Sequence, residues 1–168
     1  TKYLVKETNA IVGYTQSDEI TLILYSDDRN SSIYHNGKKQ KILSKLTAKC
    51  VNYFNTRRQE LLPNHNKLAV FDCRIYQTPT LNDAANQILW RELDATRNSI
   101  LMLAYSLFSH NEVNNLNTVQ LRDKLINEKN VNWNTYPTRF KRGTYVKRKI
   151  VSKPFTQDEL NTLPLQHN

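Results

Sequence analysis

Alternating and periodic apolar positions divide the first half of the chain into predicted strands and a helix. Apolar, β-branched and aromatic runs at residues 10–15 and 20–25 predict two strands. Over 38–55, apolar residues recur every three or four positions, which is the spacing of an amphipathic helix. A further run at 68–78 predicts a third strand. The predicted order is therefore strand, strand, helix, strand.

The second half of the chain is predicted to be helical at first and then basic. Thr80 with Asp83 three residues later signals a helix start, and the helix extends to about Phe108 with a polar interruption over 94–99. A short helix is predicted at 118–127. Residues 140–151, introduced by Pro137, predict a basic strand or strand pair. The tail from Pro154 is predicted to be irregular.

This order of elements predicts an α+β fold. Strand, strand, helix, strand is what a split βαβ sandwich keeps when its first strand is removed, and residues 1–9 then form the end of the helix that follows that strand. We therefore expect the first strand of such a sandwich to be missing from these 168 residues. We expect a core at residues 1–110 and a basic extension of helix and strand at 111–168.

Length and composition narrow the class of protein. The chain has 168 residues, enough to bury a substantial core. Its two cysteines, Cys50 and Cys73, fit no metal spacing and favour a reducing, cytoplasmic compartment. No apolar run approaches the roughly 20 residues that cross a bilayer. Only three glycines are present, so a glycine-rich phosphate loop is excluded and phosphate binding would rely on side chains or helix ends.

The charge distribution points to a polyanionic partner. The net charge is +9, and residues 121–153 carry ten basic residues against Asp123 and Glu128, a net +8. Such clustering favours nucleic acid. A solvated basic face without a partner is the alternative.

The polar residues between the two first strands are the leading candidates for chemistry. Gln16, Ser17, Asp18 and Glu19 contain neither glycine nor proline, so their polarity is not that of an ordinary turn. A solvated hairpin turn is the alternative explanation. Because adjacent residues of a regular strand point to opposite faces, Asp18 and Glu19 can share a site only if the turn breaks that alternation.

Four segments resemble the tRNA-histidine guanylyltransferase family, including its Thg1-like branch, and they follow the family's order. The segments are GYTQSDEITLIL, FDCRIY, WRELDATRNSI and NVNWNTYPTRFKRGTYV. Thr96 stands where the family's HINN motif has a histidine tied to histidine tRNA. This departure points to the Thg1-like branch, which resembles a 3′-to-5′ polymerase repairing truncated tRNA 5′ ends.

The resemblance implies a ferredoxin-like polymerase palm, with two Mg²⁺ ions as cofactors, GTP and ATP as substrates and tRNA as partner. A tetramer is implied as well. Carried over residue by residue, it makes Asp18 and Glu19 the catalytic metal ligands. It also implies nucleotide contacts from Ser17, Lys38, Lys41 and Asn98. Arg97 shares a helix face with Asp94 and Asn98, and the expected RNA contacts are Arg97, Asn132, Trp133, Arg139, Lys141 and Arg142.

Each implied role has a plainer alternative. Lys38 and Lys41 also fit a solvated first helical turn, Arg97 with Asp94 fits an intrahelical ion pair, and Trp133 fits a core position equally well. The family's first metal carboxylate lies on an upstream RLDGR-like strand that this sequence does not contain. A catalytically silent tRNA-binding homologue or fragment is therefore the alternative to the enzyme.

Overall fold

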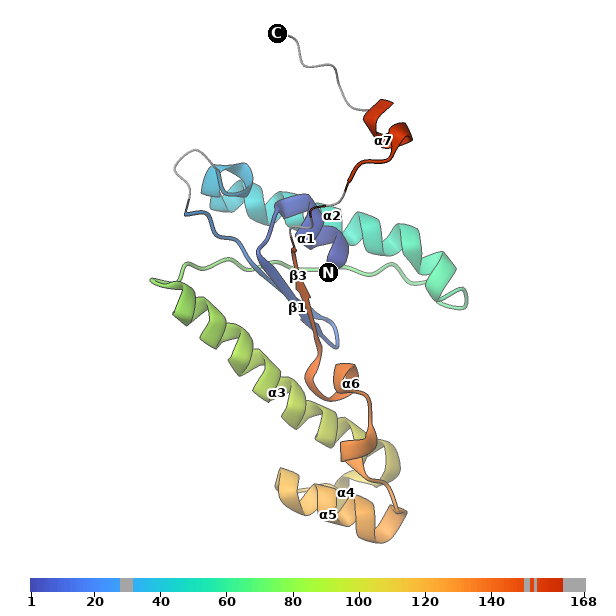
Figure 1. The fold of residues 1–168 in the computed structure, drawn as a ribbon. Coiled ribbons are helices and arrows are strands. Elements are labelled where there is room, and N and C mark those ends of the chain that lie inside the picture. Colours follow the sequence, from blue (N-terminus) through green and yellow to red (C-terminus); the bar gives the residue numbers. More distant parts are fainter. Residues whose placement is uncertain (28–31, 150–151, 153, 162–168) are drawn as a thin grey trace.

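A small antiparallel sheet lies between two groups of helices (Figure 1). The computed structural model describes residues 1–27, 32–149, 152 and 154–161. Strands β1 (Val12–Gln16), β2 (Glu19–Ile23) and β3 (Thr144–Lys147) form the sheet in the order β2-β1-β3. Tyr14 of the central strand pairs with Thr21 on one side and Tyr145 on the other. Segments from near the two ends of the chain thus meet in one sheet.

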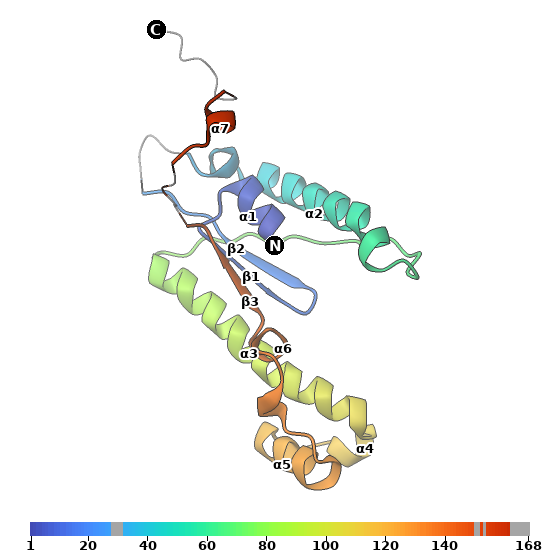
Figure 2. The same ribbon diagram turned by 45° about the vertical axis from the view of Figure 1, so that its right-hand side comes forward.

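Helices α1 (Lys2–Thr8) and α2 (Lys39–Leu61) cover one face, and the short helix η1 (Tyr34–Gly37) leads into α2. Their core is the buried cluster of Leu4, Ile42 and Leu46, on which the β2 side chains Ile20 and Leu22 pack. Figure 2 shows α1 beside the strands. This approach needs glycine at position 13, because a Cβ there would lie 2.5 Å from Val5 Cγ2.

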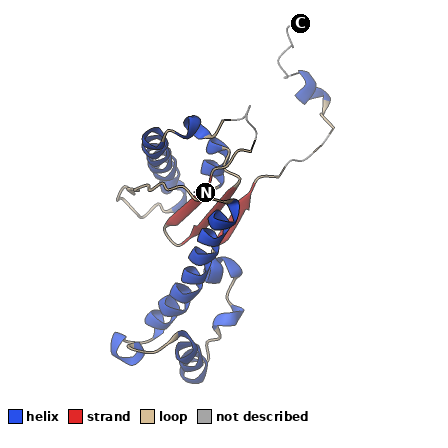
Figure 3. Cartoon of the chain, turned by 90° about the vertical axis from the view of Figure 1, so that its left-hand side faces the viewer, coloured by secondary structure: helices blue, strands red, loops and turns tan. Residues whose placement is uncertain are grey.

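Helix α3 (Leu81–Leu107) crosses the other face of the sheet (Figure 3). Tyr14 is buried on this face, 4.9 Å from the Tyr145 ring. The Tyr14 hydroxyl donates to the Arg142 carbonyl (2.8 Å), and the Tyr145 hydroxyl donates to Glu92 of α3 (2.6 Å). Burial raises the pKa of both phenols, and the Glu92 carboxylate adds to this effect. Both hydroxyls therefore stay protonated and donate hydrogen bonds, which connect β1 to Arg142 and β3 to α3.

The second half of α3 passes beyond the sheet and builds another core. Around it lie α4 (His110–Val113), α5 (Thr118–Lys129), the short helix η2 (Trp133–Thr135) and α6 (Thr138–Arg142). The shared apolar cluster consists of Ile100, Leu103, Ala104, Phe108, Val113, Leu121, Leu125 and Trp133. Because α3 contacts the sheet and contributes to this core, it ties the sheet to the helical extension.

Several predicted elements are confirmed with shifted boundaries, and the class is α+β as predicted. The two first strands, the helix near residue 1, α2 and α5 all form. Thr80 begins α3 in a capping box with Asp83, as predicted. None of the helices in the described part of the chain is both long and apolar enough to cross a membrane.

Three predictions about the second half are wrong. The interruption at 94–99 does not occur, because Ala95 and Ser99 face the interior while Asp94 and Asn98 hydrogen-bond each other on the outside. The basic strand predicted at 140–151 begins only at Thr144, since Pro137 instead caps α6; positions 150 and 151 lie outside the described residues. The tail contains a helix, α7 (Gln157–Asn161).

The strand predicted at 68–78 is also not formed. Residues 69, 71, 73 and 75 are half-buried and those between them are exposed, so the segment keeps the period of two that an extended chain shows. Asn55 of α2 holds one end by accepting from the Ala69 amide (2.8 Å) and donating to its carbonyl (2.9 Å). Among the described residues no strand pairs with it, and a sheet requires hydrogen-bonded neighbours. The predicted alternation is thus present without the predicted pairing.

We expect Leu125→Ala to lower the free energy of unfolding by about 2–5 kcal/mol, because Leu125 is 0% exposed and the loss leaves a cavity in the helical core. The neighbouring Ile126 is 43% exposed, so Ile126→Ala is the matched control, with an expected loss below about 1 kcal/mol. Urea unfolding followed by circular dichroism measures both. Equal losses would contradict the assigned core.

Candidate functional site

The tip of the β1–β2 hairpin carries the polar residues singled out in the sequence. Gln16 and Glu19 form the last pair of the ladder, so Ser17 and Asp18 make the turn. Ser17 has a positive φ of 47°, which is uncommon for a residue other than glycine. The turn breaks the strand alternation, and Asp18 and Glu19 both line the same groove. The geometric condition for a shared site is met.

Helix α3 holds this hairpin through an ion pair. Arg91 Nε donates to Glu19 Oε2 (3.0 Å), and its Nη2 donates to the same oxygen. Gln16 Nε2 donates to that oxygen too (2.8 Å). On its other side the Arg91 guanidinium lies 3.4 Å from Asp94. Hydrogen bonding to Glu19 raises the pKa of Arg91, with partial burial opposing it. Sequence reasoning assigned Arg91 no role; only its place three residues before Asp94 hinted at one.

A groove of about 790 Å³ opens between the hairpin, α3 and the α6–β3 segment. It brings together five of the predicted site residues: Ser17, Asp18, Glu19, Asn98 and Arg139. Aromatic and apolar side chains from Met102, Tyr105 and Phe140 complete its wall. The groove therefore combines carboxylates, an amide, cations and flat rings within one open space.

Trp133 lies beneath this groove, not in it. The side chain is 6% exposed, and its indole N–H donates to Ser99 Oγ (3.1 Å). Lys141 covers the ring at 5.1 Å and donates to the Asn134 carbonyl (2.7 Å), while Asn132 caps η2 through the Asn134 amide. The prediction that Trp133 contacts RNA does not fit this burial, whereas the alternative, a core position, does. The sequence could not decide because a tryptophan suits either role.

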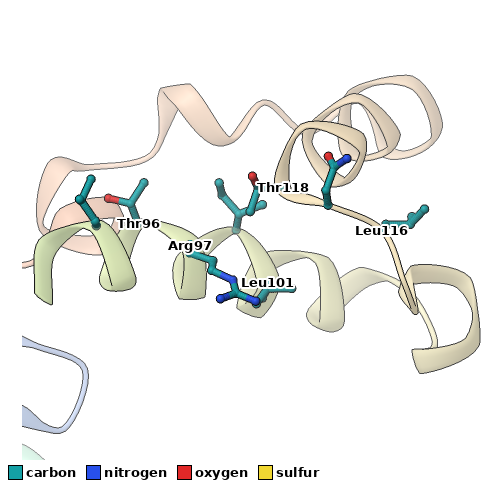
Figure 4. A pocket seen from close by; sticks show the side chains of 8 residues that line it. Thr96, Arg97, Leu101, Leu116 and Thr118 are labelled. Carbon is teal, nitrogen blue, oxygen red and sulfur yellow. The ribbon is translucent and has the colours of Figure 1, made fainter. Parts of the chain in front are cut away.

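The remaining predicted RNA contacts lie at separate places. Arg142 is exposed and lies 3.7 Å from Glu92. Arg97 is exposed on α3 beside a smaller pocket of about 380 Å³, which α3 forms with the segment entering α5 (Figure 4). Leu101 lines both this pocket and the groove, so the two hollows are neighbours. Arg97 makes no ion pair with Asp94, which instead contacts Arg91 and Asn98.

Lys38 and Lys41 do not join the groove. They lie at the start of α2, on the opposite side of the sheet from α3, and both are exposed. Partial desolvation, together with the charges of Lys41, Lys45 and Lys49, lowers the pKa of the nearby His35. A second positive region therefore surrounds the N-terminal end of α2, where the helix dipole also favours anions.

The described residues do not by themselves form a magnesium site. No group of three or more histidine, cysteine, aspartate or glutamate side chains in the described part of the chain is placed to hold a metal ion. Glu19 is engaged by Arg91, and Asp18 is the exposed carboxylate of the turn. Magnesium prefers several oxygen ligands in octahedral geometry. Among the described residues, Asp18 would supply only part of this set, and water and substrate phosphates would have to supply the rest.

The fold and sequence are similar to those of tRNA(His) guanylyltransferases. The family model described as "Thg1: tRNAHis guanylyltransferase" matches residues 1–79. A bacterial tRNA(His) guanylyltransferase (Thg1)-like protein in complex with ATP is 37% identical with a TM-score of 0.82, over 88% of this chain and 65% of that one. A bacterial tRNA(His) guanylyltransferase (Thg1)-like protein in complex with GTP is 34% identical with a TM-score of 0.72. The match covers 90% of this chain and 62% of that one.

The tRNA(His) guanylyltransferase of the yeast Kluyveromyces lactis is 27% identical over 153 residues, which is 83% of this chain and 63% of the yeast protein. The chain thus spans less than two thirds of the length of each of these three proteins. These findings confirm the resemblance to the tRNA-histidine guanylyltransferase and Thg1-like family that the four sequence segments indicate.

We expect Ser99→Ala to destabilise the protein by about 1–3 kcal/mol, because it leaves the buried Trp133 indole N–H without its acceptor. Ser106 also lies on α3, where it bonds only its own helix at Leu103, so Ser106→Ala is the matched control and should change stability by less than about 0.5 kcal/mol. Thermal unfolding measures both variants. An unchanged midpoint for Ser99→Ala would show that the indole finds another acceptor.

Proposed function

We propose that this chain is part of a polymerase-palm nucleotidyltransferase of the Thg1-like kind, which adds nucleotides in the 3′-to-5′ direction to tRNA 5′ ends. The observation that carries the proposal is the groove that collects Ser17, Asp18, Glu19, Asn98 and Arg139 from three distant parts of the chain. The bacterial relatives in complex with ATP and GTP support a nucleoside triphosphate as substrate.

In this proposal the tRNA 5′ phosphate is first activated by a nucleoside triphosphate with release of pyrophosphate. The 3′-hydroxyl of an incoming nucleoside triphosphate then attacks the tRNA 5′ phosphorus in line, which forms a phosphodiester bond and releases the nucleoside monophosphate that the first step attached. Such reactions rely mainly on positioning and charge neutralisation. Ser17 at the turn and Arg139 at the rim would contact phosphates, and the Asn98 amide would contact the nucleotide.

The positive charges fit an RNA partner whose backbone crosses this surface. Arg139 lines the groove, and Arg142 and Lys141 follow it in α6. Their cations would contact phosphates, while the rings of Tyr105 and Phe140, which line the groove, would stack with unpaired bases. Lys38 and Lys41 belong to a separate region, which favours a triphosphate held at the start of α2.

Magnesium is the cofactor that the resemblance implies, and no group of three or more histidine, cysteine, aspartate or glutamate side chains among the described residues is placed to hold it. By the same resemblance, the family's first metal carboxylate lies on an upstream strand. The unpaired segment 68–78 is consistent with this, since a split βαβ sandwich without its first strand leaves another strand short of a neighbour. A tetramer belongs to the proposal on the resemblance alone, and a cytoplasmic location belongs to it on the cysteine usage.

The basic residues of α6 would serve one other function equally well, a catalytically silent tRNA-binding module. Such a protein would keep the basic surface of α6 and lose the chemistry at the hairpin. The two functions differ in whether Asp18 matters, because a pure binder has no need of this carboxylate.

We expect Asp18→Asn to reduce Mg²⁺-dependent nucleotide addition to a 5′-truncated tRNA by about 100-fold or more, with tRNA affinity nearly unchanged. Gel analysis of labelled tRNA follows addition, and Asp123→Asn on α5 is the control for loss of one carboxylate. Addition by Asp18→Asn at a rate close to that of the wild type would overturn the assigned role. A wild-type chain that binds tRNA but adds nothing would favour the silent module.

We expect Arg139→Gln to weaken the binding of all tRNAs to the same extent, whatever their sequence. The slope of the logarithm of the binding constant against the logarithm of salt concentration should fall in magnitude by about one. The reason is the loss of one phosphate contact with its released counterion. Arg57→Gln is the control, because Arg57 is an exposed α2 arginine paired with Glu60. Fluorescence anisotropy over a salt series gives both slopes, and equal slopes for the two variants would place the RNA elsewhere.

A further inference from the structure

The two hairpin carboxylates have different surroundings although they are neighbours in the sequence. Glu19 Oε2 accepts from Arg91 twice and from Gln16 once. Asp18 is exposed at the turn, and no hydrogen bond or ion pair of its side chain is among those found for the described residues. The negative charge of Glu19 is therefore offset by Arg91 and its side chain is held in place, whereas the Asp18 carboxylate is open to the groove.

A divalent cation at Glu19 would have to share it with a guanidinium. The second oxygen, Oε1, lies on the same carboxylate, so a metal there would be only a few ångströms from the Arg91 charge. Two cations at that separation repel each other, most strongly where water is partly excluded. Arg91 has 22% of its side chain exposed, so this charge is only partly screened.

We propose that Glu19 and Arg91 form a latch that positions Asp18, and that Glu19 is not itself a metal ligand. This inference rests on the proposed function, because the position of Asp18 affects activity only if the hairpin takes part in the chemistry. Arg91 is then a positioning residue. Arg91 joins the hairpin at residues 12–23 to the helix that begins at Leu81. On its other side, Arg91 Nη2 lies 3.4 Å from Asp94 Oδ2.

The alternative, in which Glu19 ligates the metal, predicts opposite effects for one substitution. If Arg91 competes with the metal for Glu19, Arg91→Gln frees a carboxylate and tightens metal binding. If Arg91 holds the hairpin for Asp18, Arg91→Gln loosens the turn and weakens metal binding. The two roles are thus separated by the sign of the change.

The first measurement is binding of Mn²⁺, used as a spectroscopic substitute for Mg²⁺, by the full chain. We expect Asp18→Asn to abolish it, whereas Glu19→Gln and Arg91→Gln each weaken it about two- to fivefold, the range of a partly exposed ion pair. The double variant should lose no more than either single one, because both remove the same contact. Tighter binding by Arg91→Gln, or complete loss by Glu19→Gln, would overturn the proposal.

The second measurement does not depend on a metal or on activity. Amide hydrogen exchange at residues 16–19 should become about two- to fivefold faster in Arg91→Gln, because the contact that holds Glu19 is lost. Arg57→Gln, which removes an exposed ion pair elsewhere, should leave these amides unchanged. Unchanged exchange in Arg91→Gln would overturn the latch even for a chain that binds no Mn²⁺. Faster exchange in a chain without nucleotidyl transfer would retain the latch and reject the enzyme.

Discussion

Two consecutive residues of α3 hold the helix on the sheet, and the groove depends on them. Arg91 reaches Glu19 at the start of β2, and Glu92 accepts from Tyr145 on β3. These strands are the two edges of the sheet, on either side of β1. Because adjacent helical residues diverge by about 100°, one turn of α3 can contact both edges. The hairpin tip, α3 and α6 thereby enclose one groove.

Local signals in the sequence predicted the helices α1, α2, α3 and α5 and missed the short helices between and after them. Thr80 and Asp83 marked the start of α3, and apolar spacing indicated α2 and α5, because these features act within a few residues. Contacts between residues far apart in the sequence could not be predicted from such local signals. Nothing local shows that β3 pairs with β1, that Trp133 turns toward Ser99, or that Arg91 meets a glutamate 72 positions earlier. The unpaired segment 68–78 follows the same rule, since its alternation is local and its hydrogen bonding is not.

The candidate site was also predictable from local signals but not from contacts between distant parts of the chain. Ser17, Asp18 and Glu19 were found from their unusual polarity and from the resemblance, and the structure places them with Asn98 and Arg139. Lys38 and Lys41 were assigned to the same nucleotide, yet they lie across the sheet at the start of α2. A bound triphosphate at α2 and chemistry at the hairpin would need a ligand that passes the edge of β2. Spacing along the sequence could not reveal that distance.

The charges within the groove give the latch a further physical reason. Asp18, Glu19 and Asp94 all line the groove, and like charges gathered in a partly enclosed space repel one another. Arg91 lies between Glu19 and Asp94 and contacts both. A single guanidinium therefore offsets two carboxylates and leaves the third, Asp18, as the uncompensated negative charge at the tip. A cation drawn to the groove would then be directed to the turn, where the exposed side chain of Asp18 can turn toward it at little cost in packing.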